Sequence, residues 1–561
     1  MIDTDRRDLF RLGGAAGLML LASETRAAPA PEVRVAPLGE GDLAIVNARI
    51  ITLDPQRPDA QAALVRRGRI VMVGGNRDVL AAGRDCPQFD AGGKAMIPGF
   101  VDNHCHLEDS CIVADQQMQL QGATSIAEIV DRLRGIAAKT PKGEWIIVQA
   151  PRGLFPEKAA ERRWIARTDL DQATQAHPVM MLFGIHFSAM NSPAFRQTGY
   201  WDSDMPATAV WSDGSPRRGS IVQRDGQGMP TGIITEIWDY RPGYSVDQYK
   251  AAITAHVGAW FLAKGLTSIT TLQNESPAQF QALQILQAEG RLPVRLRVAP
   301  IVPHAVPLSD VTRLGWRTGF GSDMLRFGGV KFFLDGIHSD GQGHVADDIK
   351  WRREDLIRTL TDCQRGGLQT ILHAVSDEAV LLALDCIEAA QKAAPGELRH
   401  RIDHQSPKTD ALIQRFADLG VVSGITGRQQ AIGDRSSSAA SARLHRFRTL
   451  YEKRAGILVL DAAGPGGNYH PMRGIANAMA TDAEGGSALP GEALTFEQAL
   501  RLWTIEPARN SFEDDRKGSI EAGKFGDFAV LSADPRGRPP QEIFAIDTVA
   551  TIVGGQLVHG G

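Results

Sequence analysis

Strand-like and helix-like segments alternate through the middle of the chain, and this alternation restricts the folds open to it. Eight short apolar segments are typical of buried strands, and helical stretches such as 376–392 and 411–419 lie between them. The eight predicted strands are 97–104, 266–272, 294–301, 328–335, 368–373, 400–404, 420–425 and 456–461. Parallel strands joined by helical crossovers predict an α/β fold, a TIM (β/α)8 barrel, with a site at the carboxyl ends of its strands.

Strand-rich segments with glycine turns flank the predicted barrel on both sides. We expect residues 40–96 and 513–561 to form one composite β-sandwich domain, with the barrel (residues 97–512) inserted between its halves. Residues from about 110 to 245 are additional to the eight predicted barrel strands and contain strands of their own. We therefore predict a large insertion after barrel strand 1 that covers the site.

The N-terminus is typical of a targeting segment. Arg6 and Arg7 form a twin-arginine pair, and a short apolar run at 12–22 and small residues before position 31 follow it. We predict a Tat signal peptide at residues 1–30, recognition by the Tat export machinery, and a periplasmic protein. An ordinary Sec signal and an uncleaved anchor remain alternatives. No later stretch has eighteen consecutive apolar residues, so we expect no stable membrane insertion.

Composition excludes two further classes of protein. The net charge is −4 and no strongly basic stretch stands out, so nucleic acid is not an expected partner. The five cysteines form no CxxC pair, and this odd number argues against a disulfide scaffold.

Two histidines end the first predicted barrel strand. His104 and His106 are spaced i, i+2, and residues with this spacing point to the same side of a strand. Neutral imidazole is a common ligand for zinc, so the pair is a candidate metal site. The alternative is two polar residues in a loop after a strand.

Three more candidate ligands lie at the ends of other predicted strands. Lys331 lies within an apolar strand, where an unpaired charge is costly. It either extends its amine to water or is an N-carboxylated lysine that bridges two metals. His373 and His404 each end a strand. Each histidine alone fits a hydrogen-bonded structural role, but four at the carboxyl ends of barrel strands form a plausible ligand set.

Several longer motifs resemble the amidohydrolase superfamily, and most closely its YtcJ-like branch (amidohydrolase family 3). The resemblance extends from about Leu43 to the end, and the motifs are IPGFVDNHCH, HFSAMNS, GMPTGIITE, GVKFFLDG, ILHAVSDEAV, HRIDHQ, LTFEQALRLWTIEPAR and KGSIEAGKFGDFAVL. It implies a TIM barrel with a composite β-sandwich and one or two Zn²⁺ ions. It further implies that His104 and His106 bind the first metal, Lys331 is the carboxylated bridging lysine, and His373 and His404 bind the second metal.

The chain departs from the family pattern at the end of strand eight. The family usually has Ser-Asp-x-Pro there, and its aspartate binds metal and transfers protons. Alignment on Pro465 places Ala463 at the position of that aspartate, whereas Asp461 lies two residues earlier. Since i and i+2 share a face, Asp461 is the candidate for the proton transfer, one layer deeper in the barrel.

Four other residues are candidates for substrate contact or support. His186 is a catalytic candidate that is expected to hold the substrate carbonyl, and Asn191 is a candidate for substrate binding. The alternative is that both only brace the insertion. His338 follows the lysine strand and either contacts substrate or is a polar loop residue. Asp377 is expected to cap its helix and to orient His373 from behind.

The resemblance implies that metal-activated hydroxide cleaves a non-peptide C–N bond of a small amide, N-acyl or N-formyl compound. One alternative is a lactone or ester hydrolase on the same centre. Another is a metal-binding homologue without catalytic activity, because Ala463 replaces the usual aspartate. The partners expected are a small-molecule substrate and a second copy of the chain in a homodimer.

Overall fold

The computed structural model describes residues 41–151, 154, 156, 159–183, 187–203, 221–235, 244–272, 277–302, 306–335, 337–339, 344–346, 349, 351–426, 444–460 and 470–560. The predicted signal peptide lies outside these residues. No helix within them combines the length and hydropathy needed to cross a membrane.

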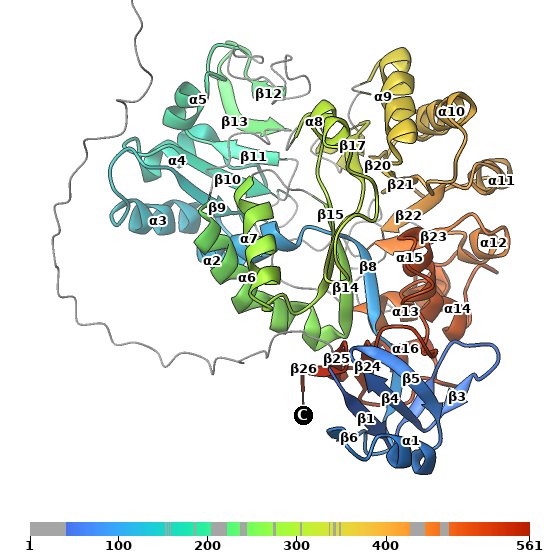
Figure 1. Ribbon diagram of the computed structural model, residues 1–561. Helices are drawn as coiled ribbons and strands as arrows, with labels where there is room; N and C mark the ends of the chain where they lie inside the picture. The colour runs from blue at the N-terminus through green and yellow to red at the C-terminus, as the bar shows by residue number, and fades with distance from the viewer. Residues whose placement is uncertain are drawn as a thin grey trace, which may run out of the picture. The chain divides into compact units, whose positions relative to one another are not determined.

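A strand lies at each of the eight positions predicted for the barrel (Figure 1). Helices of 6 to 17 residues connect most of these strands, including α7 (Pro277–Ala288), α9 (Arg353–Gly366), α10 (Asp377–Ala393) and α11 (Asp410–Asp418). The strands are β8 (Phe100–Cys105), β14 (Leu266–Leu272), β15 (Arg295–Ala299), β17 (Val330–Phe333), β20 (Thr370–His373), β21 (Arg401–Asp403), β22 (Val422–Thr426) and β23 (Ile457–Leu460). The alternation in the sequence therefore identified these elements correctly.

These strands pair in two parallel sheets. One has the order β16-β15-β14-β8, where β16 is Leu325–Phe327, and the other has the order β17-β20-β21-β22-β23. The strand pairing of the described residues thus gives two separate sheets, and it does not show the closed TIM barrel predicted above.

One continuous segment passes from the first sheet to the second. β16 pairs with β15, β17 pairs with β20, and only Gly328 and Gly329 separate β16 from β17. Gly329 has φ +126°, and a Cβ there would lie 2.3 Å from the carbonyl oxygen of Gln369, so the turn between the sheets requires glycine. Ile301 and Lys331 form a parallel bridge across the junction.

Two sheets are built from the ends of the described chain. The six-stranded sheet has the order β26-β25-β24-β7-β2-β3 and joins β24 (Phe528–Leu531), β25 (Thr548–Val553) and β26 (Gln556–His559) to β7 (Ala95–Pro98), β2 (Arg49–Ile51) and β3 (Asp59–Ala60). The four-stranded sheet has the order β5-β4-β1-β6, in which β1 is Leu43–Val46, β4 Ala62–Arg66, β5 Arg69–Gly74 and β6 Gln88–Asp90. Both contribute buried apolar residues to one cluster, including Ile45, Val65, Met96, Phe528 and Ile552.

The segment after β8 has a sheet and a core of its own. Its strands have the order β12-β13-β11-β10-β9, and they are β9 (Ile146–Gln149), β10 (Val179–Phe183), β11 (Phe187–Met190), β12 (Ile221–Arg224) and β13 (Pro230–Thr235). The helix α3 (Ile126–Ala137) packs its apolar face into a buried cluster with this sheet, and that cluster includes Ile129, Leu133, Val148 and Met181. This sheet pairs only with strands of its own segment among the described residues.

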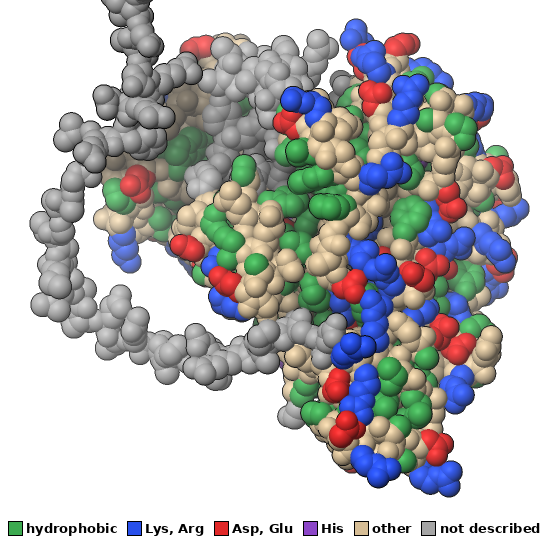
Figure 2. Space-filling model, in the orientation of Figure 1, with side chains coloured by type: hydrophobic (Ala, Val, Ile, Leu, Met, Phe, Trp, Pro, Cys, Tyr) green, Lys and Arg blue, Asp and Glu red, His purple; other side chains and the backbone are tan. Residues whose placement is uncertain are grey.

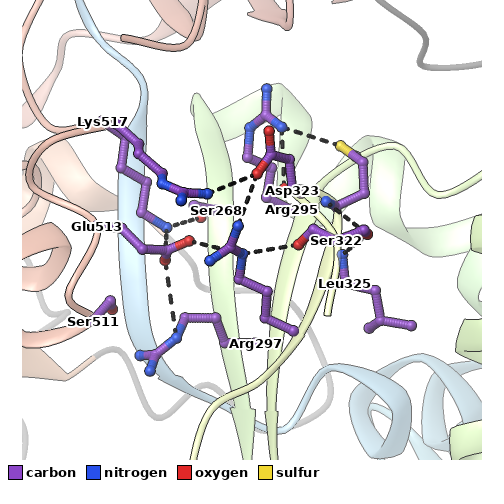
Figure 3. A network of polar contacts seen from close by, with 12 residues as sticks. Ser268, Arg295, Arg297, Ser322, Asp323, Leu325, Ser511, Glu513 and Lys517 are labelled. Carbon is purple, nitrogen blue, oxygen red and sulfur yellow. Dashed lines mark hydrogen bonds and ion pairs between the residues drawn. The ribbon is translucent and has the colours of Figure 1, made fainter. Parts of the chain in front are cut away.

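A buried charge network ties the segment before the last strands to the first parallel sheet (Figure 3). Lys517 Nζ lies 2.8 Å from Glu513 Oε2 and donates to Ser268 Oγ over 2.6 Å. Arg297 Nε lies 3.9 Å from the same Glu513 oxygen. The face seen in Figure 2 shows acidic and basic side chains interspersed, in keeping with a net charge of −4.

Candidate metal centre

His104 and His106 lie at the end of β8 but not in the same element. β7 and β8 are separated by Gly99, at which a Cβ would lie 2.2 Å from Thr267 Oγ1. β8 ends at Cys105, and His106 is the N-cap residue of α2 (Leu107–Gln116). The two ring centroids are 5.4 Å apart with the planes at 87°. The rings are therefore neighbours, although the strand geometry predicted for both applies only to His104.

His373 and His404 bring two more imidazoles to the same place. His373 is the last residue of β20, and His404 follows β21 with φ +73°. The His404 ring centroid lies 4.5 Å from that of His104 and 4.6 Å from that of His373. Four histidines from the ends of three strands thus form one cluster, which we call the histidine cluster.

The hydrogen bonds of the histidine cluster fix the form of two imidazoles. His104 Nδ1 donates to Asp403 Oδ2 over 2.7 Å, and His106 Nδ1 donates to the carbonyl oxygen of Leu272 over 2.6 Å. The pKa of His104 is lowered to about 4, chiefly by burial and next by the charge of Lys331, while Asp403 opposes this shift. His104 is therefore neutral, with its proton on Nδ1 and a lone pair on Nε2.

Lys331 lies beside the cluster in a fully buried position. Its side chain is 1% exposed, and its Nζ lies 3.9 Å from Asp403 Oδ2 and 5.6 Å from the ring centroid of Phe333. Burial lowers the pKa of the Lys331 amine to about 8, and Asp403 opposes that shift. The neutral form of the amine is therefore more populated near neutral pH than it is in an exposed lysine, although the protonated form still predominates.

At this site His104 Nε2 and Lys331 Nζ are buried and lack a hydrogen-bond partner among the residues that the structure describes. Burying such groups is costly unless another group satisfies them, and imidazole nitrogens are ligands that zinc prefers. Within the described ranges, however, no group of three or more His, Cys, Asp or Glu side chains is arranged so that it could hold a metal ion. The residue types and the unsatisfied atoms fit a divalent metal, although the described residues alone do not complete such a group.

Two aspartates support the cluster, and the sequence analysis did not identify them. Asp403 contacts both His104 and Lys331. Asp335 Oδ1 lies 3.9 Å from His373 Nε2, and its carboxylate also accepts from the backbone N–H groups of Val375 and Ser376. The sequence feature that could have identified these two aspartates is a carboxylate within or directly after a short apolar strand, where an unpaired charge is costly.

Asp377 does not take the supporting role predicted for it. Ser376, not Asp377, caps α10, because its side chain accepts from the N–H of Ala379. The Asp377 carboxylate is 71% exposed and lies 3.6 Å from Lys408 Nζ. The acidic neighbour of His373 within the described residues is Asp335.

The Asn191 side chain forms its hydrogen bonds within the insertion. Its buried amide donates to the carbonyl oxygens of Thr174 and His177, over 3.1 and 2.9 Å. Its Oδ1 accepts from the N–H groups of Val179 and Ala194, over 2.9 and 3.1 Å. These four bonds engage both N–H groups and the carbonyl oxygen, which is the bracing arrangement rather than a substrate contact.

The remaining predicted residues are only partly within the described structure. Asp461, His186 and Ala463 lie outside the described residues. His338 lies in β18 (Ile337–Ser339), which pairs with β19 (His344–Ala346), and the description covers its backbone alone. A cavity of about 260 Å³ adjoins the histidine cluster, and its lining includes His404, Val375, Asp377, Gln405, Ser406 and Lys408.

The chain is similar to known proteins in sequence and in fold. N-substituted formamide deformylase of Arthrobacter pascens is 26% identical over 550 residues, which cover 92% of this chain and 98% of that protein. The putative amidohydrolase YtcJ of Bacillus subtilis (strain 168) is 25% identical over 511 residues, which cover 84% of this chain and 90% of that protein. A crystal structure of an uncharacterized metal-dependent hydrolase from Pyrococcus furiosus has the same fold, with a TM-score of 0.64 and 21% identity, and covers 88% of this chain and 99% of that one.

The model of the amidohydrolase family matches residues 88–559, which is most of the chain. The resemblance found in the motifs is thereby confirmed. This protein belongs to the amidohydrolase family and is an enzyme of the amidohydrolase type.

Proposed function

We propose that this enzyme is a metal-dependent hydrolase that cleaves a non-peptide C–N bond in a small amide, N-acyl or N-formyl compound. The observation that carries the proposal is the histidine cluster with buried Lys331 beside it, at the carboxyl ends of parallel strands. The name of the related formamide deformylase supports an N-formyl substrate, and the printed title of the Pyrococcus furiosus structure supports metal dependence.

The two parallel sheets are proposed to be the two parts of one TIM (β/α)8 barrel. The segment that joins β16 to β17 supports this, since it pairs with the first sheet on one side and with the second on the other. The backbone N–H of Val302 also donates to the carbonyl oxygen of Lys331 over 2.8 Å. On the opposite side, β23 packs beside β8.

The residues that would hold one or two Zn²⁺ ions are His104, His106, Lys331, His373 and His404. A divalent metal, when bound, supplies Lewis-acid chemistry, because it polarises a carbonyl group and allows water to act as a nucleophile near neutral pH. Hydrogen bonds from Nδ1 leave Nε2 of both His104 and His106 with a lone pair, which is the form of imidazole that a metal requires.

Lys331 is proposed to be N-carboxylated. Its buried amine is partly neutral because burial lowers its pKa to about 8, and a neutral amine adds to CO₂ with loss of one proton. The product is a carbamate with two acceptor oxygens. The buried amine lacks a hydrogen-bond partner among the described residues. Carboxylation would convert it into an anionic group beside the imidazoles.

Asp461 is proposed to transfer the proton to the leaving nitrogen, and His186 and His338 are proposed to contact the substrate. General acid–base help is worth about 100- to 10,000-fold in rate. The substitution Asp461→Asn should lower kcat by about that factor at every pH. An unchanged kcat across the pH range would show that the proton comes from another group.

Metal content and turnover test the proposed function directly. We expect purified protein to contain one or two zinc ions per chain, to hydrolyse N-formyl amines or N-acyl amino acids, and to lose that activity with a chelator. The double substitution His373→Asn and His404→Asn should lose both zinc and turnover, whereas Asp362→Asn, which changes an exposed carboxylate on α9, should retain them. Protein that binds no zinc and hydrolyses none of these compounds would refute the proposal. Turnover of lactones or esters alone would favour the alternative chemistry on the same residues.

Export to the periplasm through the Tat machinery remains a proposal supported by Arg6 and Arg7. Cell fractionation of the wild type and of a variant with both arginines changed to lysine tests it. Retention of the variant in the cytoplasm would support the proposal, and export of both proteins to the periplasm would refute it.

A further inference from the structure

We infer that Asp403 is a positioning residue, held by Arg401 and accommodated by Gly424, that fixes the orientation and the tautomer of His104. The inference rests on the proposed function, in which His104 is a metal ligand. It concerns a group that would not itself contact the metal.

Both oxygens of the Asp403 carboxylate accept hydrogen bonds from fixed donors. Arg401 Nη2 donates to Oδ2 over 2.6 Å, and Arg401 Nε donates to Oδ1 over 3.1 Å. His104 Nδ1 donates to Oδ2 over 2.7 Å. The side chains of Asp403 and Arg401 are both 0% exposed, so neither exchanges these contacts for water. A buried carboxylate in a two-point bond to a guanidinium has little freedom to turn.

Arg401 also reaches the strand that carries His104. Its Nη1 donates to the carbonyl oxygen of Asn103 over 2.7 Å, although β21 and β8 are not neighbours in either parallel sheet. The same guanidinium therefore fixes both the backbone directly before His104 and the carboxylate that holds the His104 ring. This arrangement sets the position of the imidazole relative to strand β21.

Gly424 makes room for the carboxylate. Asp403 and Gly424 are paired in the β21–β22 register, and a Cβ on Gly424 would lie 2.2 Å from Asp403 Oδ1. No side chain fits there unless the carboxylate moves. Because Gly424 has an ordinary φ, the requirement for glycine at this position comes from Asp403 and not from the backbone.

The consequence for His104 follows from the donor and acceptor roles. A carboxylate only accepts, so it holds the imidazole proton on Nδ1 and leaves the lone pair on Nε2. Nε2 is buried and lacks a hydrogen-bond partner among the described residues, so it is available to a metal. Partners of this kind on metal-binding histidines typically affect metal affinity about 10- to 100-fold.

A purely structural ion pair would predict a different result. In that case loss of Asp403 would lower the stability of the fold, but folded protein would bind metal as before. The test therefore needs metal affinity measured on folded protein, with a variant that leaves both charges of the pair in place.

The experiment compares Asp403→Asn and Gly424→Ala with the wild type, using Zn²⁺ alone in competition with a chromophoric chelator. The visible spectrum of the Co²⁺-loaded proteins reports the ligand geometry, and circular dichroism gives the folded fraction. We expect both variants to bind Zn²⁺ about 10- to 100-fold more weakly and to change the Co²⁺ spectrum. The matched control is Asp362→Asn, which removes the same charge from an exposed carboxylate on α9. It should bind Zn²⁺ as the wild type does.

Gly424→Ala decides the matter if Asp403→Asn does not fold, because it keeps Asp403 and Arg401 and only displaces the carboxylate. Wild-type affinity and an unchanged Co²⁺ spectrum in folded variants would overturn the inference and leave the proposed function standing. A wild-type protein that binds no Zn²⁺ would overturn both.

Discussion

Arg295, the first residue of β15, and Asp527, which directly precedes β24, form a buried ion pair with two parallel hydrogen bonds. Nε donates to Oδ2 over 2.7 Å, and Nη2 donates to Oδ1 over 3.0 Å. The guanidinium also lies over the ring of Phe525, 3.7 Å from its centroid, and Asp527 accepts from the N–H of Gly554. The pair therefore connects a strand of the first parallel sheet to the sheet that joins both ends of the described chain.

Removal of one partner of this pair should be strongly destabilising. Arg295→Met leaves the Asp527 carboxylate buried without its counterion, and we expect the free energy of unfolding to fall by about 3–5 kcal/mol. Chemical denaturation followed by circular dichroism measures the change. Arg77→Met removes an arginine that is 95% exposed and pairs with Asp78, and it should cost less than about 1 kcal/mol. Equal losses in the two variants would show that the buried pair does not hold the sheets together.

Acid should weaken the network around Glu513. Burial opposes ionisation of this carboxyl, but Lys517 and Arg297 outweigh burial and lower its pKa from the ordinary 4.5 to about 2. The folded state therefore binds the Glu513 proton less readily than the unfolded state does. The stabilisation is fully present above about pH 4.5, and it disappears as the pH falls from there toward 2.

The variant Glu513→Gln isolates this effect. Its free energy of unfolding should be lower than that of the wild type at neutral pH, and the difference should shrink as the pH falls below about 4.5. Denaturation curves at several pH values measure the difference. A gap between the two proteins that stays constant down to about pH 3 would contradict the role assigned to Glu513.

Gly329 should tolerate no side chain. Gly329→Ala puts a Cβ 2.3 Å from the carbonyl oxygen of Gln369 at φ +126°, so we expect a loss of about 3 kcal/mol in the free energy of unfolding. The control is Gly258→Ala in α6 (Val246–Trp260), where no atom lies within 4 Å of the added Cβ. That change should stabilise the protein by about 0.5 kcal/mol. Similar changes in the free energy of unfolding at both glycines would show that the connection from β16 to β17 does not require Gly329.

Asn191 should matter for stability rather than for substrate binding. Asn191→Ala removes a helix cap and leaves buried backbone groups without their partners, so we expect a loss of about 2–4 kcal/mol. Ser245→Ala, which removes only the cap of α6, should cost about 1 kcal/mol. KM for folded protein should stay unchanged. A raised KM with unchanged stability would instead assign Asn191 to the substrate.

The sequence predicted the local elements of the barrel region well because those signals are local. Apolar runs such as 266–272 and 368–373 are strands in the structure, and histidines at the ends of runs lie at the carboxyl ends of strands. The pattern failed at His106, because β8 ends one residue earlier and His106 is the N-cap residue of α2 instead. It also assigned the support of His373 to Asp377 by proximity in sequence, whereas Asp335 Oδ1 lies 3.9 Å from His373 Nε2 and the Asp377 carboxylate is exposed.

The sequence by itself determined which segments form strands, which family the chain belongs to and which four histidines and one lysine are candidate ligands. These features depend on residue type, on periodicity and on spacing, all of which can be read along the chain. Only the tertiary structure decided that Asp403 faces His104, 299 positions away, and that Arg401 reaches Asn103 across two strands that do not pair. Such contacts depend on how the strands are placed side by side, and buried carboxylates find their partners only through that packing.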